Sequence, residues 1–258
     1  MCVLPVFYVT LVRAYSALVV IIEPIVSMRR WLYIYRRSFT RSLNNQALLI
    51  SMQSAQAQMF IVSAPSGAGK TSLVRRAITE VSGLTVAVSH TTRAIRPGEV
   101  EGEHYHYVDR EEFSRMIDSD QFLEYADVFG NFYGTSMDSV NTALAAGMDV
   151  ILEIDWQGAA QVRQKFSDVT SIFILPPSRN SLIERLRGRG QDSEEIIERR
   201  TVEAVAEMRQ YHRADYLIIN DNFDEALAEL KAVVLSHRVQ KSRQAHRHAG
   251  LITSLTHE

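Results

Sequence analysis

From Met59 onward, short apolar runs alternate with longer stretches in which apolar residues recur at helical spacing. The apolar runs are five to seven residues long and read MFIVSA, TVAVS, DVILEID, VTSIFIL and YLIIN. Runs of this length without polar alternation are typical of strands buried on both faces of a parallel sheet. Helices are predicted between them at about 70–80, from about 157, at 179–187, 192–212 and 223–240. The pattern therefore predicts an α/β fold, a parallel sheet with helices on both faces.

The stretch from 89 to 135 breaks this rhythm. It carries β-prone aromatic residues on either side of a short predicted helix near 110–118, namely Tyr105, Tyr107, Phe132 and Tyr133. We expect a small mixed β insertion beside the main sheet. The basic tail at 241–258 follows the last predicted helix, and the spacing of its histidines matches no metal site, so we expect the solvated end of a helix.

The first 58 residues differ from the rest of the chain. They begin with a strongly apolar stretch, but Arg13 and Glu23 leave an uncharged run of only nine residues between them. A membrane-spanning helix needs about 20 mostly apolar residues, and no small-residue cleavage site follows the apolar run. Three interpretations remain open: a membrane or targeting segment, a regulatory extension, or translated sequence upstream of the true start. Met52 opens a short polar lead into the first strand, as the start of a compact domain would.

The net charge limits which macromolecules the protein can bind, and the cysteine content indicates its redox compartment. The 258 residues include 28 Lys and Arg against 30 Asp and Glu, a net charge of -2, which gives no overall attraction to nucleic acid or membranes. Any anion site must therefore be local. Cys2 is the single cysteine, which excludes an internal disulfide framework and fits a reducing, cytoplasmic compartment.

The segment SAPSGAGKTS, residues 63–72, has nearly the spacing of a phosphate-binding loop, G-x-x-x-x-G-K-S/T, and lies between a predicted strand and a predicted helix. Ala64 stands at the first glycine position. Lys70 can reach the β- and γ-phosphates of a nucleotide, and the Thr71 hydroxyl can ligate Mg²⁺. The expected ATP contacts along this loop are Ala64, Pro65, Ser66, Gly67, Ala68, Gly69, Lys70, Thr71 and Ser72.

Two carboxylates follow a later apolar run, in EIDWQG. Glu153 and Asp155 have the same parity, so both should point to one side of a strand. A charge there is costly unless it is paired or faces a ligand. Either residue could serve Mg²⁺ through a water, and the alternative is a salt bridge at the edge of the core.

A second anion site is predicted inside the insertion. Arg93 and Arg96 lie three residues apart in a loop and could clamp a dianionic phosphate, although an ordinary solvated loop would look similar. Other polar residues of this region are Ser89, Glu99, Tyr105, Glu124, Tyr133 and Thr135. An ionised carboxylate such as Glu124 only accepts hydrogen bonds, which suits the adjacent N–H donors of guanine and does not suit adenine.

Taken together, these segments resemble a guanylate kinase of the bacterial type. The similarity runs from about Met59 to about Lys241 and includes SAPSGAGK, SHTTR, RPGEVEGEHY, FGNFYGT, EIDWQGA, FILPPS, RLRGRGQDSEE and YLIIND. The resemblance implies a domain over 59–258 with a parallel-sheet core, a GMP-binding insertion and a mobile lid. The core would comprise 59–88, 149–185 and 214–240, the insertion 89–135, and the lid 186–212.

The resemblance also implies roles for single residues. Arg93, Arg96, Tyr105 and Tyr133 match GMP-phosphate ligands, and Ser89, Glu124 and Thr135 match guanine contacts. Asp155 matches a position near the base or the metal, while Glu99 matches the residue that braces the arginine loop. Arg189 and Arg200 match lid arginines that close on the ATP phosphates, and Asn220 matches an adenine contact. Lys70, Arg93, Arg189 and Arg200 would be the catalytic residues. Two positions depart from the usual pattern, Ile95 in place of proline and Ala64 in place of glycine, and neither removes a charge or a ligand.

The implied reaction is transfer of the γ-phosphoryl group of ATP, with Mg²⁺, to GMP in purine nucleotide metabolism. Neither nucleic acid nor membrane is expected as a partner of the catalytic domain, and the oligomeric state is left open, with a homo-oligomer as one outcome. A kinase for another nucleoside monophosphate is the enzymatic alternative, against which Glu124 and Thr135 argue. A guanylate-kinase-like binding module is the alternative without catalysis, but such modules degrade the phosphate loop, and Gly69, Lys70 and Thr71 are intact here.

Overall fold

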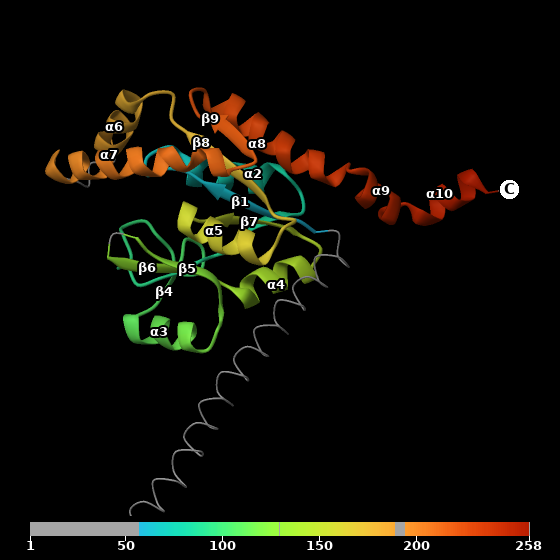
Figure 1. The fold of residues 1–258 in the computed structure, drawn as a ribbon, viewed down its shortest axis with the longest axis horizontal. Helices are drawn as coiled ribbons and strands as arrows, with labels where there is room; N and C mark the ends of the chain where they lie inside the picture. The colour runs from blue at the N-terminus through green and yellow to red at the C-terminus, as the bar shows by residue number, and fades with distance from the viewer. Residues whose placement is uncertain (1–56, 129, 189–193, 258) are drawn as a thin grey trace, which may run out of the picture. The chain divides into compact units, whose positions relative to one another are not determined.

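The computed structural model describes residues 57–128, 130–188 and 194–257. Its main sheet has five parallel strands in the order β2-β7-β1-β8-β9 (Figure 1). The strands are β1 (Met59–Ser63), β2 (Leu84–Val86), β7 (Asp149–Glu153), β8 (Thr170–Leu175) and β9 (Tyr216–Ile219). The predicted parallel α/β sheet is confirmed, because all neighbouring strands pair in parallel and each strand overlaps one of the apolar runs.

Helices cover both faces of this sheet (Figure 1). Along β1, Phe60 and Val62 join the core cluster on one face, whereas Met59 and Ile61 join the cluster on the other. The first face is covered by α2 (Lys70–Glu80) and α8 (Phe223–Arg238), and the second by α4 (Met137–Ala145) and α5 (Trp156–Lys165). Burial on both faces explains why β1, β7 and β8 have no polar alternation, whereas the edge strand β9 exposes Tyr216, Leu217 and Ile219.

A second, mixed sheet lies in the insertion, as predicted. Its four strands have the order β4-β3-β6-β5, with β3 and β4 parallel and the other neighbours antiparallel. The strands are β3 (His90–Thr91), β4 (His106–Tyr107), β5 (Phe122–Val128) and β6 (Asn131–Ser136). Helix α3 (Arg110–Asp118) packs on this sheet through Phe113, whose ring stacks on Phe122 with centroids 4.5 Å apart.

Two helices follow β8. Helix α6 (Arg179–Gly188) and helix α7 (Glu194–Met208) bury a small cluster of their own around Leu182, Leu186 and Ile197. The single helix predicted at 192–212 is shorter, because α7 ends at Met208 and a 3₁₀ turn, η1 (Arg209–Arg213), follows it.

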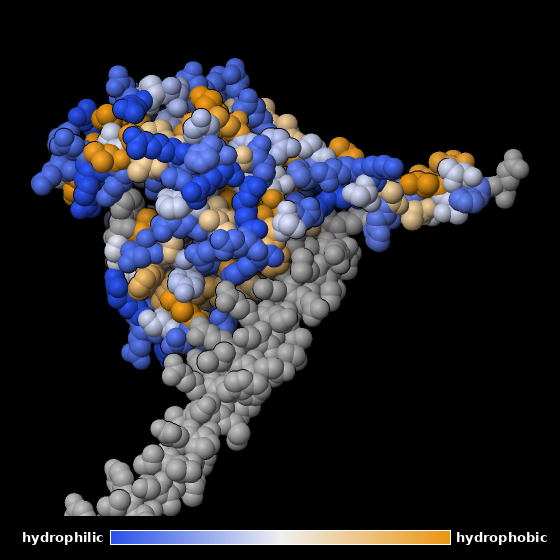
Figure 2. Space-filling model, in the orientation of Figure 1, coloured by the Kyte–Doolittle hydropathy of each residue, from blue (hydrophilic) through white to orange (hydrophobic). Residues whose placement is uncertain are grey.

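Three further details differ from the sequence prediction. Helix α4 was not predicted, and the strand expected at 85–89 ends at Val86. The tail forms two short helices, α9 (Lys241–Arg247) and α10 (Ala249–Thr256), rather than the end of one helix. Helix α10 exposes Leu251 and Leu255, and apolar side chains are visible on this part of the chain in Figure 2.

The possible membrane segment within the first 58 residues lies outside the described residues. Among the helices that the structure does describe, none combines the length and the apolar character that crossing a bilayer requires.

Candidate active site

The phosphate loop runs from the end of β1 to the start of α2. Gly67 and Gly69 have φ of 91° and 94°, a region that favours glycine. Asp120 is the only described residue other than glycine with positive φ, so Ala64 needs no glycine conformation. The alanine at the first position of the motif is therefore compatible with the loop.

The loop is braced from behind by residues far away in the sequence. The Asn220 side chain donates a hydrogen bond to the Ala68 carbonyl at 2.7 Å, and Arg185 donates to the Asn220 carbonyl at 2.9 Å. A Cβ atom at Gly69 would overlap the Asn220 amide. Asn220 is buried here and does not line the cavity described below, so its expected contact with adenine stays a prediction. Arg185 was missed by the sequence analysis.

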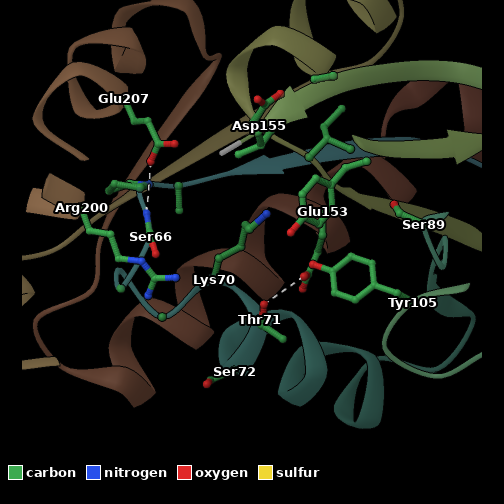
Figure 3. Close-up of a pocket in the computed structure, with 18 of the residues that line it drawn as sticks. Ser66, Lys70, Thr71, Ser72, Ser89, Tyr105, Glu153, Asp155, Arg200 and Glu207 are labelled. Carbon is green, nitrogen blue, oxygen red and sulfur yellow. Dashed lines mark hydrogen bonds between the residues drawn. The ribbon is translucent and has the colours of Figure 1, made fainter. Parts of the chain in front are cut away.

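One cavity of about 260 Å³ adjoins both the phosphate loop and the insertion (Figure 3). The Lys70 side chain points into it, with the loop on one side and Ser89 and Tyr105 on the other. The predicted residues that line it are Ala64, Pro65, Ser66, Gly67, Gly69, Lys70, Thr71, Ser72, Ser89, Arg96, Tyr105, Glu124, Tyr133, Glu153, Asp155 and Arg200. Ala68, Arg93, Glu99, Thr135 and Asn220 do not line it, and Arg189 lies outside the described residues.

Glu153 and Asp155 have different structural positions. Strand β7 ends at Glu153, whose carboxylate accepts a hydrogen bond from the Thr71 hydroxyl at 3.1 Å. Asp155 lies beyond the strand and caps α5, accepting the Gly158 N–H at 2.8 Å. The prediction that both project from one strand is therefore wrong for Asp155, although both line the cavity.

Hard oxygen ligands for Mg²⁺ are present where the sequence predicted them. The Thr71 hydroxyl and the Glu153 carboxylate meet at the edge of the phosphate loop, and Mg²⁺ prefers one or two such ligands together with phosphate oxygens and water. Within the described ranges, no three His, Cys, Asp or Glu side chains gather as a metal site built by protein alone. The donor set fits a metal that arrives with a nucleotide.

Glu124 is a buried carboxylate in the wall of the cavity. Its residue is 3% exposed, and one carboxylate oxygen, Oε1, accepts the Thr135 N–H at 2.9 Å. The Thr135 hydroxyl is itself 3.0 Å from the Ser89 hydroxyl. Burial raises the pKa of Glu124 to about 7, against the opposing effect of the hydrogen bonds from Thr135. The three residues that were predicted to contact guanine therefore form one hydrogen-bonded group.

Glu99 organises the arginine loop. Both of its carboxylate oxygens accept from the Arg93 guanidinium, at 2.8 and 3.0 Å, and one also accepts the Arg96 N–H at 2.8 Å. The Tyr107 hydroxyl donates to the same carboxylate at 2.8 Å. Burial opposes the charge of Glu99, but the hydrogen bonds from Arg93, Arg96 and Tyr107, together with the charge of Arg93, outweigh it and the pKa falls to about 2. Arg96 lines the cavity, whereas Arg93 does not line it but interacts with Tyr133 and lies near the Tyr105 ring, which both do. Tyr107 is a residue that the sequence analysis missed.

Known proteins are similar to this chain in sequence and in fold. A family model described as guanylate kinase matches residues 56–237. The chain belongs to the guanylate kinase family. Guanylate kinase of Escherichia coli strain K12 is 56% identical over 204 residues, which cover 78% of this chain and 98% of that protein. The guanylate kinase of Salmonella typhimurium strain LT2 gives the same identity and coverage. The crystal structure of guanylate kinase from Anaplasma phagocytophilum has 31% identity and a TM-score of 0.61, covering 72% of this chain and 89% of that one.

In this member of the guanylate kinase family, two tyrosines complete the wall beside the arginine loop. The rings of Tyr105 and Tyr133 meet edge to face with centroids 5.7 Å apart, and the Arg93 guanidinium lies 5.5 Å from the centre of the Tyr105 ring. Burial raises the pKa of Tyr105 to about 12. The Tyr105 hydroxyl thus stays protonated at neutral pH and can donate a hydrogen bond to an anion.

Helix α7 contributes Arg200 and Glu207 to the cavity. The Glu207 carboxylate accepts the backbone N–H of Ser66 at 3.2 Å, so it contacts the phosphate loop directly (Figure 3). Burial raises the pKa of Glu207. The sequence analysis missed Glu207, although it lies seven residues after Arg200 on a predicted helix, a spacing that places both on one face.

Proposed function

We propose how the protein carries out the reaction of its family, the transfer of the γ-phosphoryl group of ATP to GMP, which forms ADP and GDP. One observation carries the proposal: a single cavity is lined at once by the phosphate loop and by the predicted acceptor residues. Phosphoryl transfer needs donor and acceptor held in line in a site that excludes water. A kinase of this kind needs two anion sites that open into one space, and the lining of this cavity supports that arrangement.

The donor is ATP, held by the phosphate loop. The backbone N–H groups around Gly67 and Gly69, together with the start of α2, favour a bound phosphate anion. Lys70 points into the cavity and neutralises charge on the transferring group. Thr71 and Glu153 hold Mg²⁺, which neutralises charge on the β- and γ-phosphates when bound. Arg200 and Arg189 act from the lid, the latter as an expectation from the family pattern alone.

The acceptor is GMP, held by the insertion. Arg96, Tyr105 and Tyr133 line the cavity and bind the phosphate. Arg93 lies next to them, held by its ion pair with Glu99, with its guanidinium 5.5 Å from the centre of the Tyr105 ring. An oxygen of the GMP phosphate attacks the γ-phosphorus, and the bond from that phosphorus to the oxygen bridging the β-phosphate breaks. No general base is required, because the attacking phosphate is already ionised at neutral pH.

Guanine is recognised by the group formed by Glu124, Thr135 and Ser89. The ionised Glu124 carboxylate accepts from the two adjacent N–H donors on the guanine edge, and an adenine base offers no such pair. Asp155 contributes to this wall of the cavity mainly by fixing the start of α5.

Residues 89–135 form the GMP-binding insertion in this proposal. Residues 186–212 form the lid, which excludes water when it closes. We place the protein in the cytoplasm.

A coupled assay with MgATP and each of GMP, AMP, UMP and CMP tests this function. It is run on the full chain and on a chain that begins at Met52, which also tests whether the first residues affect the reaction. We expect turnover with GMP alone and the same rate for both chains. A preference for AMP would overturn the role of Glu124, and no turnover with any acceptor would favour a binding module.

A further inference from the structure

The first turn of α5 lies directly against the carboxylate that reads guanine. Gly158 is buried in this turn, and its N–H is fixed by the Asp155 cap at 2.8 Å. A Cβ atom built on Gly158 would lie 3.0 Å from the Glu124 carboxyl carbon and closer still to its Oε2 oxygen. Any side chain at this position would therefore occupy the space that the Glu124 carboxylate fills.

Glu124 has little freedom to move aside. Its other oxygen, Oε1, holds the Thr135 N–H at 2.9 Å, and Glu124 pairs with Thr135 across strands β5 and β6. The carboxylate is buried between this strand pair and α5, so a displaced carboxylate would lose its hydrogen bond or its packing.

Backbone conformation does not require glycine at this position. Gly158 is absent from the described glycines with positive φ, and it lies in the regular turn of a helix. In a helix, alanine is favoured over glycine. Local helix energetics would thus select alanine at position 158, and the space beside Glu124 is what selects glycine.

We propose that Gly158 is a positioning residue for guanine recognition, because its missing side chain lets the Glu124 carboxylate stand at the angle that GMP requires. The inference rests on the proposed function, since it presumes that Glu124 reads guanine. It concerns the acceptor side: the atoms nearest to a Cβ atom at Gly158 belong to Glu124 and Ile154.

The test is Gly158→Ala, with Gly250→Ala as the matched control, since a Cβ atom at Gly250, in helix α10, meets open space. We expect Gly158→Ala to lower kcat/KM for GMP by about 100-fold, mainly through KM, since small misplacement of a positioning group can cost this much. The KM for ATP should stay within about twofold. Gly250→Ala should behave as the natural chain.

A double-mutant comparison separates positioning from general damage. In a Glu124→Ala background the carboxyl is gone, so adding Gly158→Ala should change the remaining GMP activity by less than about twofold. An equal loss in both backgrounds, or unchanged GMP kinetics in the single variant, would overturn the proposal.

Two further outcomes distinguish a failure of the Gly158 proposal from a failure of the proposed guanine recognition by Glu124. If Gly158→Ala alone does not fold, thermal melting should show that adding Glu124→Ala restores the folded state, and a pair no more stable than the single variant would overturn the inference. If the natural chain does not use GMP, or Glu124→Ala leaves GMP turnover intact, the proposed guanine reading fails instead.

Discussion

The Thr71 hydroxyl donates a hydrogen bond to the Glu153 carboxylate at 3.1 Å, which links the start of α2 to the end of β7. The two residues are 82 positions apart, and the parallel pairing of β1 with β7 brings them together. Because these strands end at the same edge of the sheet, the phosphate loop and the acidic strand end form one wall of the cavity.

The contact between Thr71 and Glu153 predicts how the reaction rate depends on the Mg²⁺ concentration. Thr71→Ala removes the hydroxyl and should raise the Mg²⁺ concentration needed for half-maximal rate by about tenfold or more. Thr71→Ser keeps the hydroxyl and should stay close to the natural chain. Steady-state rates over a Mg²⁺ titration at saturating ATP and GMP measure the Mg²⁺ requirement of each variant. Equal Mg²⁺ requirements for Thr71→Ala and Thr71→Ser would contradict the assignment of the Thr71 hydroxyl as a Mg²⁺ ligand.

Lys70 is expected to act on the transferring phosphoryl group rather than on GMP binding. Lys70→Ala should lower kcat by at least about 100-fold, since removal of one charge-stabilising group typically costs this much. Calorimetric titration with GMP in the absence of ATP should show affinity within about threefold of the natural chain, because the acceptor site is built from other residues. Full turnover in the variant would exclude the proposed role.

Glu99 is expected to hold the acceptor arginines in place. Glu99→Gln removes the charge that keeps Arg93 at 2.8 Å and should raise KM for GMP by about tenfold while leaving KM for ATP unchanged. Tyr107→Phe, which removes one bond to the same carboxylate, should have a smaller effect in the same direction. Since the pKa of Glu99 is lowered from 4.5 to about 2, its stabilising contribution is lost as the pH falls from about 4.5 through about 2, and the natural chain should show no titration of this pair near neutrality.

Most of the fold could be predicted because its signals are local. The apolar runs, the phosphate loop and α2 each depend on residues close together in the sequence. Helix α4 also had a local signal that was overlooked, since Ser136 caps it by accepting the Ser139 N–H. Contacts between distant segments had no such signal: Glu207 lies 141 positions from Ser66, and Asn220 lies 152 positions from Ala68. These contacts depend on how the strands and helices pack, which no single segment specifies.

The raised pKa of Glu124 predicts a pH dependence. Because its pKa of about 7 lies above the unfolded value of 4.5, the carboxyl stabilises the nucleotide-free fold at low pH, and this contribution is lost as the pH rises through about 7. The proposed contact with guanine needs the ionised form of Glu124, so the affinity for GMP should fall up to about tenfold per pH unit below 7.

The GMP phosphate also titrates near pH 6, and a matched variant separates the two effects. In Glu124→Gln the phosphate of GMP still titrates, but the carboxyl group at position 124 is gone. The affinity of this variant for GMP should therefore be weaker and should vary less steeply with pH. Calorimetry and thermal melting between about pH 5.5 and pH 8 provide both readouts. Identical pH profiles for the two chains would show that Glu124 does not titrate in this range.

The central claim, that Glu124 reads guanine in the acceptor site, is tested most directly by kcat/KM for GMP and for AMP in the natural chain and in Glu124→Gln. The natural chain should strongly prefer GMP. Glu124→Gln should lose about 100-fold in kcat/KM for GMP, as expected when a charged hydrogen-bond acceptor is removed, with little change for AMP. Unchanged GMP kinetics in Glu124→Gln, or equal use of GMP and AMP by the natural chain, would contradict the account.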